Sequence, residues 1–190
     1  DDVHMWKVSF NNVPMVDNLE AVGLDNQVVV SWDMPPGGSY DGDDISFVDG
    51  TLEDAIWMSE GTSVMGEMFN MPYGVEAVFV HSSAVWGEEG YSGPTTLYGY
   101  EVVAGNPLPT ATFSTSITLN GGAWNVVDLG WTFTGDFVLA LEISTTIAVS
   151  IDADAAPGQH SWANLGGWEP WTDVALEYGL TDGEFAINAN

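Results

Sequence analysis

Residues 124–143 read WNVVDLGWTFTGDFVLALEI, and this stretch decides the fold class. Trp124–Leu129 and Phe137–Ile143 are short runs rich in apolar residues, and Thr134-Gly135-Asp136 between them is typical of a turn. A helix would instead place its apolar residues three or four positions apart over a longer stretch. The pattern therefore predicts two β-strands that are connected by a turn.

Runs of the same kind recur along the chain and are separated by Gly, Pro, Asn and Asp. The further predicted strands are Val28–Trp32, Gly74–His81, Leu97–Ala104, Ala111–Leu119, Ile147–Ile151, Val174–Tyr178 and Glu184–Asn188. No segment shows convincing helical periodicity, and the best helical candidate, Leu52–Met58, is too short. Many short strands at close spacing predict an all-β fold, a two-sheet antiparallel β-sandwich of jelly-roll-like type.

Length and composition limit the alternatives. The 190 residues are 45% hydrophobic, which is enough for one domain with its own core and excludes wholesale disorder. The predicted organisation is a single sandwich over residues 15–190, with residues 1–14 as an additional N-terminal strand. No run of about 18 apolar residues exists, so membrane insertion is not expected. The chain contains no cysteine, which excludes disulfides and thiolate metal sites.

The charge balance is the most unusual property of the sequence. The net charge is −27, because 28 acidic residues are opposed by a single basic residue, Lys7. Such a surface repels nucleic acid phosphates and anionic lipids, so neither is an expected partner. The carboxylates must be neutralised by solvent cations, and calcium is the predicted cofactor because it is abundant outside cells. Adaptation to a high-salt habitat is the alternative explanation.

Three groups of acidic residues are candidate calcium ligands, because hard cations prefer several carboxylate and carbonyl oxygens. They are Asp41, Asp43 and Asp44, then Asp49, Glu53 and Asp54, and finally Asp152 and Asp154 at the end of an apolar run. Glycines among the first two groups allow the backbone to turn its carbonyls inward. Solvated acidic loops are the alternative interpretation of the same residues.

Tryptophans are concentrated near residues 162–171. Trp162, Trp168 and Trp171 are candidates for an exposed aromatic cluster, with Glu169 and Asp173 beside them. Exposed aromatic rings can stack on sugar rings or form the centre of a protein interface, whereas buried rings belong to a core. The sequence leaves these three alternatives open, and the same holds for the loop from Trp86 to Tyr91.

The N-terminal segment Val3–Phe10 alternates in the manner of a strand. Trp6, Val8 and Phe10 lie on one side of it. An apolar strand near a chain terminus either forms an edge of its own sheet or adds to the sheet of a neighbouring copy. The second alternative predicts strand exchange and a homo-oligomer or polymer.

Two resemblances to known families follow from the order of the short motifs. Asn18–Ala21, Val28–Asp33 and Pro35-Pro36 are similar to the first two strands of a fibronectin type III module. The remainder resembles jelly-roll modules of large secreted bacterial proteins, on Val48–Asp54, Gly105–Pro109, Gly122–Leu129, Gly135–Leu141, Ser150–Asp152 and Gly183–Ile187. The second resemblance implies an ancillary or surface module without catalysis, and residues 15–36 are expected to form part of the sandwich.

Catalytic motifs are poor in this sequence. Gly61–Gly66 lacks the spacing of a nucleophile elbow, and the three histidines, His4, His81 and His160, form no zinc motif. We therefore expect a non-enzymatic, calcium-stabilised β-sandwich that is secreted to the cell surface and that self-assembles into a filament or adhesive matrix. The alternative is a calcium-stabilised carbohydrate-binding module whose partner is a polysaccharide.

Overall fold

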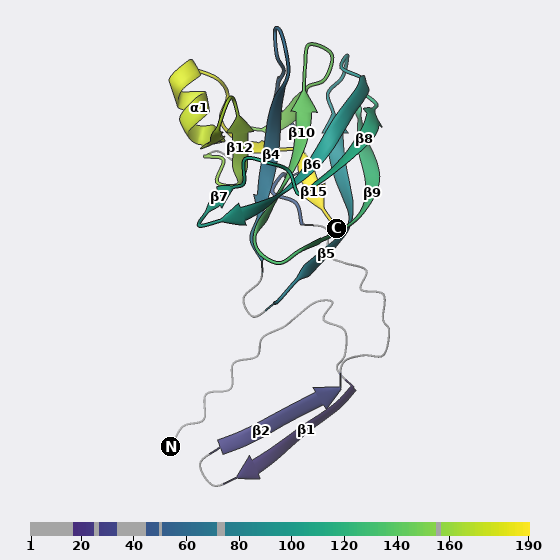
Figure 1. The fold of residues 1–190 in the computed structure, drawn as a ribbon, viewed down its shortest axis with the longest axis vertical. Helices are drawn as coiled ribbons and strands as arrows, with labels where there is room; N and C mark the ends of the chain where they lie inside the picture. Colours follow the sequence, from purple (N-terminus) through teal and green to yellow (C-terminus); the bar gives the residue numbers. More distant parts are fainter. Residues whose placement is uncertain (1–16, 25–26, 34–44, 50, 72–74, 155–156) are drawn as a thin grey trace. The chain divides into compact units, whose positions relative to one another are not determined.

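The computed structural model describes residues 17–24, 27–33, 45–49, 51–71, 75–154 and 157–190. The chain divides into two compact units, Asp1–Gly42 and Asp43–Asn190, which are described separately (Figure 1). In the first unit, β1 (Asp17–Leu24) and β2 (Gln27–Asp33) form an antiparallel two-stranded sheet of their own. That residues 15–36 form part of the sandwich stays a prediction.

The second unit contains two antiparallel sheets, which confirms the all-β sandwich. In the first sheet, the strand order is β13 (Trp168–Pro170), β12 (Ser161–Asn164), β4 (Ser63–Phe69), β10 (Phe137–Ile143), β6 (Gly93–Val103) and β7 (Asn106–Pro107), and β8 (Phe113–Leu119) also pairs with β6. In the second sheet, the order is β14 (Glu184–Phe185), β11 (Val149–Asp152), β5 (Val78–Gly87) and β15 (Ile187–Ala189), with β3 (Asp54–Ile56) paired to β11 and β9 (Ala123–Phe133) paired to β5.

Strand β10 lies at the centre of the first sheet and is buried on both faces. Phe137, Leu139 and Leu141 belong to the main core, which also contains side chains of the second sheet such as Phe185. Val138 and Ala140 point the other way, because side chains alternate along a strand, and they form a second cluster with Tyr100. This double burial explains why β10 is a continuous apolar run rather than an alternating one.

The predicted strand Val174–Tyr178 is wrong, because these residues belong to the helix α1 (Trp171–Tyr178). The helix buries Trp171, Val174 and Ala175, which have the i, i+3, i+4 spacing of one helical face. It begins after Pro170 and ends at Gly179, whose left-handed conformation (φ 66°) lets its N–H donate to the Ala175 carbonyl. Proline before the helix and glycine after it were the signals in the sequence.

Strands β4 and β12 were not predicted. Strand β4 reads SVMGEMF. The glycine and glutamate at its centre interrupt the apolar pattern in the sequence, although the strand is buried almost throughout. Strand β12 has only four residues, which is too short for periodicity to be recognised. Within the described residues, no helix is long and apolar enough to cross a membrane.

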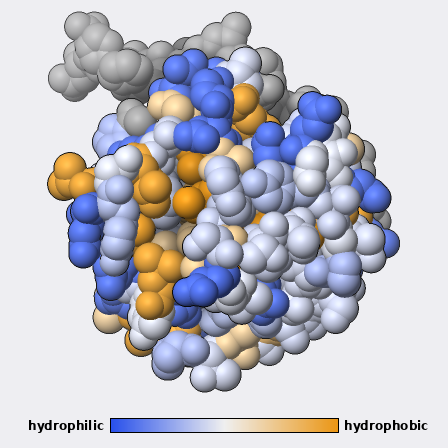
Figure 2. All heavy atoms as spheres, turned by 90° about the horizontal axis from the view of Figure 1, so that it is seen from above, coloured by the Kyte–Doolittle hydropathy of each residue, from blue (hydrophilic) through white to orange (hydrophobic). Residues whose placement is uncertain are grey.

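Apolar side chains also reach the surface of the molecule. Figure 2 shows orange, hydrophobic residues at several places between blue, hydrophilic ones. The exposed large apolar side chains include those of Trp57 (47% exposed) and Trp124 (38% exposed). Scattered apolar residues are normal on a protein surface, so those that line a cavity are the informative ones.

Candidate functional site

Trp168 is positioned by a tight hairpin between β12 and β13. Asn164 and Trp168 are opposite each other in this pair, and Trp162 is opposite Pro170. The loop turns through Gly166, which has a φ of 117° that favours glycine and whose N–H donates to Asn164 Oδ1 at 3.3 Å. The hairpin therefore fixes both the Trp168 ring and the Asn164 amide at one edge of the first sheet.

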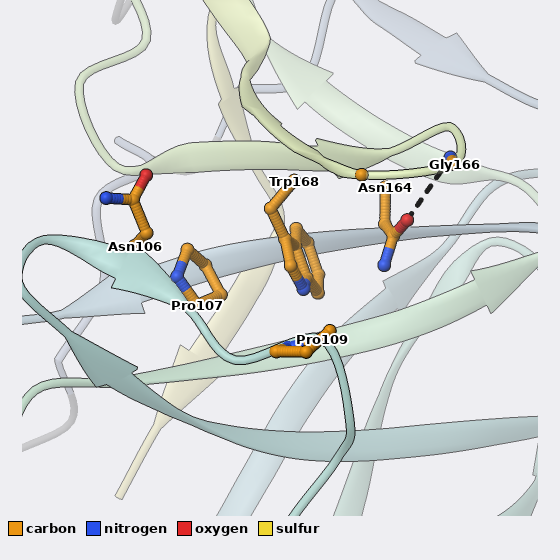
Figure 3. Close-up of a pocket in the computed structure, with 7 residues that line it drawn as sticks. Asn106, Pro107, Pro109, Asn164, Gly166 and Trp168 are labelled. Carbon is orange, nitrogen blue, oxygen red and sulfur yellow. Dashed lines mark hydrogen bonds between the residues drawn. The ribbon is translucent and has the colours of Figure 1, made fainter.

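The Trp168 ring lines a surface cavity of about 320 Å³, which we call the Trp168 pocket. Its other lining residues are Asn106, Pro107, Pro109, Asn164, Gly166 and Gly167. In Figure 3, the ring lies between Pro107 and Asn164, with Pro109 below them in this view. No charged side chain lines the pocket, so its polar side chains are the amides of Asn106 and Asn164.

A hydrogen bond and an aromatic contact fix the orientation of the Trp168 ring. Its Nε1–H donates to the Leu108 carbonyl at 3.1 Å, and the ring packs edge to face against Tyr100, with 4.9 Å between centroids. Burial raises the pKa of the Tyr100 hydroxyl to about 12. The phenol thus stays neutral, as suits a ring that packs in an apolar cluster.

The other two candidate tryptophans do not join this pocket. Trp171 is 1% exposed, packs against Phe185 and donates from Nε1 to the Thr181 carbonyl at 3.0 Å. This corrects the prediction of an exposed role for Trp171, which belongs to the core. Trp162 is half-buried on β12, and Glu169 and Asp173 are exposed. Trp168 is therefore the aromatic side chain of this group that a ligand can reach in the pocket.

Four of the predicted calcium ligands come together at one corner of the second sheet. Asp49 N–H donates to Asp152 Oδ2 at 2.7 Å, and Asp54 is opposite Ile151 in the pairing of β3 with β11. The Ala153 N–H donates to Glu53 Oε2 at 2.9 Å. The sequence identified these acids as separate groups, and the structure places Asp49, Glu53, Asp54 and Asp152 close to one another.

The carboxylates at this corner accept hydrogen bonds from the protein itself. Asp49 Oδ1 accepts from the N–H and the hydroxyl of Thr51, both at 2.8 Å, and these bonds lower the pKa of Asp49. Asp54 accepts from the Ala55 N–H at 2.8 Å and from the Thr181 hydroxyl. These acids thus connect loops to strands.

No three Asp, Glu, His or Cys side chains among the described residues are arranged to hold a metal ion. Of the other predicted ligands, Asp154 is exposed, and Asp41, Asp43 and Asp44 lie outside the described part of the chain. Calcium therefore stays a prediction. The strand-exchange residues Trp6, Val8 and Phe10 also lie outside the described residues, and that prediction is likewise untested.

A pair of buried carboxyl groups was missed by the sequence analysis. Glu67 on β4 is 0% exposed and Glu184 on β14 is 4% exposed. The hydroxyl of Ser161 is hydrogen-bonded to Glu67 Oε1 and, at 2.9 Å, to Glu184 Oε2. His160 Nδ1 lies 2.9 Å from Glu184 Oε1. Glu67 could have been noticed as a lone acid inside an apolar run.

The contacts of the Ser161 hydroxyl require a proton on one carboxyl group of the pair, and the surroundings of Glu67 favour it as the protonated one. The Ser161 hydroxyl has one proton but contacts both carboxyl groups, so the second contact requires a proton on one of them. Burial and the negative charge of Glu184 raise the pKa of Glu67 well above its usual range. Glu67 Oε2 is also buried without a hydrogen-bond partner, which costs less for a neutral carboxyl group than for a carboxylate.

This buried cluster is suited to holding the fold together. Ser161 is 1% exposed, so its hydroxyl cannot meet a substrate in this conformation. The Glu67 carboxyl also accepts from the Phe185 N–H, so it links β4 to β14 in the opposite sheet. The Glu184 carboxyl accepts from the Gln159 N–H at 2.8 Å and connects the same strands to the segment before β12.

The sequence matches no known protein family and no curated protein. Among solved structures, the clostridial cysteine protease Cwp84 after propeptide cleavage is similar, with a TM-score of 0.60, 14% identity and coverage of 77% of this chain and 39% of that one. A structure of the cysteine protease and lectin-like domains of Cwp84, a surface-layer-associated protein of Clostridium difficile, has a TM-score of 0.53, 15% identity and coverage of 67% and 31%.

The similarity to Cwp84 lies outside the catalytic part of that protein. The present chain spans less than two-fifths of the length of either structure. At 14% and 15% identity, the similarity shows a shared fold, namely a β-rich module that occurs in a bacterial surface protein. It gives no support to the fibronectin type III resemblance.

Proposed function

We propose that this chain is a non-enzymatic, lectin-like module of an extracellular surface protein, and that it binds a polysaccharide in the Trp168 pocket. The observation that carries this proposal is the ring of Trp168, which lies in a cavity beside two asparagines and two prolines. The fold shared with a structure that contains a lectin-like domain of a surface-layer-associated protein supports it.

The pocket has the chemistry that a neutral sugar requires. One face of a pyranose ring carries C–H groups and can stack on an aromatic ring, while its hydroxyl groups both donate and accept hydrogen bonds. The amides of Asn106 and Asn164 can also do both. Because contacts with Leu108 and Tyr100 already fix the orientation of the Trp168 ring, little conformational entropy is lost when a ligand binds.

The Trp168→Ala variant tests this proposal. We expect wild-type protein to bind members of an array of neutral oligosaccharides, and we expect the variant to bind the best of them about tenfold more weakly or worse. Calorimetric titration of that oligosaccharide measures the difference. The matched control is Phe79→Ala, which removes an exposed aromatic ring outside the pocket and should not change the affinity. Equal affinity of wild type and Trp168→Ala contradicts a sugar site at Trp168.

Calcium-dependent assembly is a second proposal, which is motivated by the net charge of −27 and by the convergence of Asp49, Glu53, Asp54 and Asp152. Since the described oxygens already accept protein hydrogen bonds, a complete site would need additional ligands. Calcium should therefore raise the melting temperature and promote oligomers, and EDTA should reverse both effects. Identical melting curves and identical light scattering with calcium and with EDTA contradict this proposal.

A further inference from the structure

Two adjacent cavities on the second sheet form a groove that is separate from the Trp168 pocket. One cavity, of about 330 Å³, is lined by Leu52, Trp86, Glu88, Glu89, Gly122 and Trp124. The other, of about 320 Å³, is lined by Leu52, Glu53, Asp54, Ala55, Trp57, Glu88 and Tyr91. Because Leu52 and Glu88 line both cavities, we treat the two as one aromatic–acidic groove. It shares no residue with the Trp168 pocket.

A pair of aromatic side chains lies in each cavity of the groove. Trp86 and Trp124 pack edge to face with 5.7 Å between ring centroids, and Trp57 and Tyr91 are tilted at 5.5 Å. Trp57 is 47% exposed and Trp124 is 38% exposed, although a large aromatic side chain usually buries most of its surface. The groove therefore offers flat apolar surfaces to a ligand at two places.

Every ionisable group with a charge at neutral pH in the groove is an acid: Glu53, Asp54, Glu88 and Glu89. The described residues include no lysine or arginine, so these carboxylates have no protein ammonium or guanidinium partner there. Glu88, which faces both cavities, is oriented by a hydrogen bond of 2.7 Å from the Ser150 hydroxyl. A cationic ligand would supply the missing counter-charge.

The loops that carry the groove are held rigidly. Gly121 packs so closely that an added Cβ would lie 2.7 Å from the carbonyl oxygens of Glu88 and Tyr91. The Asn125 side chain accepts from the Asn120 N–H at 2.9 Å and donates to the Ala123 carbonyl at 2.9 Å. The backbone around Glu88, Tyr91 and Trp124 is thus set before a ligand arrives, which lowers the entropic cost of binding at this side of the groove.

We propose that the aromatic–acidic groove binds a glycan with free amino groups, such as an oligosaccharide of glucosamine. The C–H faces of its sugars stack on the two aromatic pairs, and its ammonium groups pair with Glu88, Glu89, Glu53 and Asp54. This second site goes beyond the neutral-sugar function of the Trp168 pocket and does not depend on it.

The donor and acceptor balance favours an amino sugar over a basic peptide. The carboxylates of the groove only accept hydrogen bonds, so a ligand must bring donors, and glucosamine brings hydroxyl and ammonium groups. A basic peptide also brings ammonium groups, but its backbone carbonyls need donors, and the side chains of the groove offer only indole N–H groups and the Tyr91 hydroxyl. Uronates and sulfated sugars are repelled by four carboxylates.

The experiment uses two oligosaccharides of equal length, one of glucosamine and one of N-acetylglucosamine, which differ in the charge of the amine. Calorimetric titration of the whole chain at physiological ionic strength should show the glucosamine oligosaccharide binding at least about tenfold more tightly. Glu88→Gln with Glu89→Gln, and separately Trp124→Ala, should each weaken its binding about tenfold. Glutamine at position 88 keeps an oxygen for Ser150, and far-UV circular dichroism checks folding.

Matched controls separate the groove from the general negative charge. Asp173→Asn with Glu177→Gln removes the same charge from the exposed surface of α1, and Phe79→Ala removes an exposed aromatic ring outside the groove. Both should leave the affinity unchanged, and so should Trp168→Ala, whatever that variant does to neutral sugars. Equal affinity for the two oligosaccharides overturns the proposal, as does equal weakening by the control pair. Tighter binding of a lysine oligomer that is lost in the same groove variants would identify a basic peptide instead.

Discussion

As the pH rises, the stability of the Glu67→Gln variant is expected to decrease less than the stability of the wild-type protein. In the native protein, burial and Glu184 raise the pKa of Glu67 well above its ordinary value of 4.5. Between these two pKa values the native state holds a proton that the unfolded state has released, so the free energy of unfolding falls with increasing pH. This contribution is fully present below pH 4.5 and is lost as the pH rises through the native pKa. Glutamine is neutral throughout, so the variant lacks this contribution.

Melting temperatures of wild type and Glu67→Gln from about pH 5 to about pH 8.5 measure this effect. The variant should become the more stable protein toward the alkaline end, because it no longer has to bury a carboxylate beside Glu184. His160, Glu184 and all exposed acids are the same in both proteins, so their effects largely cancel in the difference. Glu177→Gln, which changes an exposed acid on α1, should follow the wild-type curve. Parallel curves for wild type and Glu67→Gln would show that Glu67 is ionised in the native state.

Trp171→Ala should destabilise the sandwich by about 3–5 kcal/mol, the usual cost of removing a large buried aromatic side chain. Trp171 is 1% exposed and fills the space between α1 and Phe185. Its removal leaves a cavity, deprives the Thr181 carbonyl of its donor and takes away the largest of the three buried side chains of the helix. Urea unfolding, followed by circular dichroism because the variant changes the tryptophan fluorescence, measures the loss.

Two further variants give this prediction its controls. Trp168→Ala removes the same side chain from a partly exposed position and should cost clearly less stability, which also makes it a suitable binding variant. Trp171→Phe keeps an aromatic ring but not the indole N–H, and it should lie between wild type and Trp171→Ala. A loss below about 1 kcal/mol for Trp171→Ala would mean that α1 contributes little to the sandwich.

The sequence was sufficient to predict the fold class, because short apolar runs and the turn residues between them are local signals. The strand Phe137–Ile143 was predicted with its correct bounds, since its apolar run is bordered by Gly135-Asp136 on one side and by polar residues on the other. The helix α1 was missed because only eight residues carry its pattern, and the last five were interpreted as a strand. Pro170 before this segment and Gly179 after it instead favour a helix.

The candidate sites were harder to predict, since they depend on contacts between distant residues. The sequence grouped Trp162, Trp168 and Trp171 as neighbours, yet Trp168 lines its pocket with Asn106, Pro107 and Pro109, about 60 positions earlier in the chain. The acids near residue 50 and residue 152 were each identified, but their hydrogen bonds to backbone N–H groups follow from the pairing of β3 with β11. Glu67 and Glu184 meet because the two sheets face each other.

The double burial of β10 has a consequence for the unfolded chain. A seven-residue segment of high β-propensity that is concealed on both faces becomes a template for cross-β stacking when the sandwich opens. At neutral pH the net charge of −27 keeps such chains apart, whereas near the isoelectric point of about 4.1 that electrostatic protection disappears. Heating should thus be reversible in neutral buffer of low salt and should give insoluble aggregates in acid.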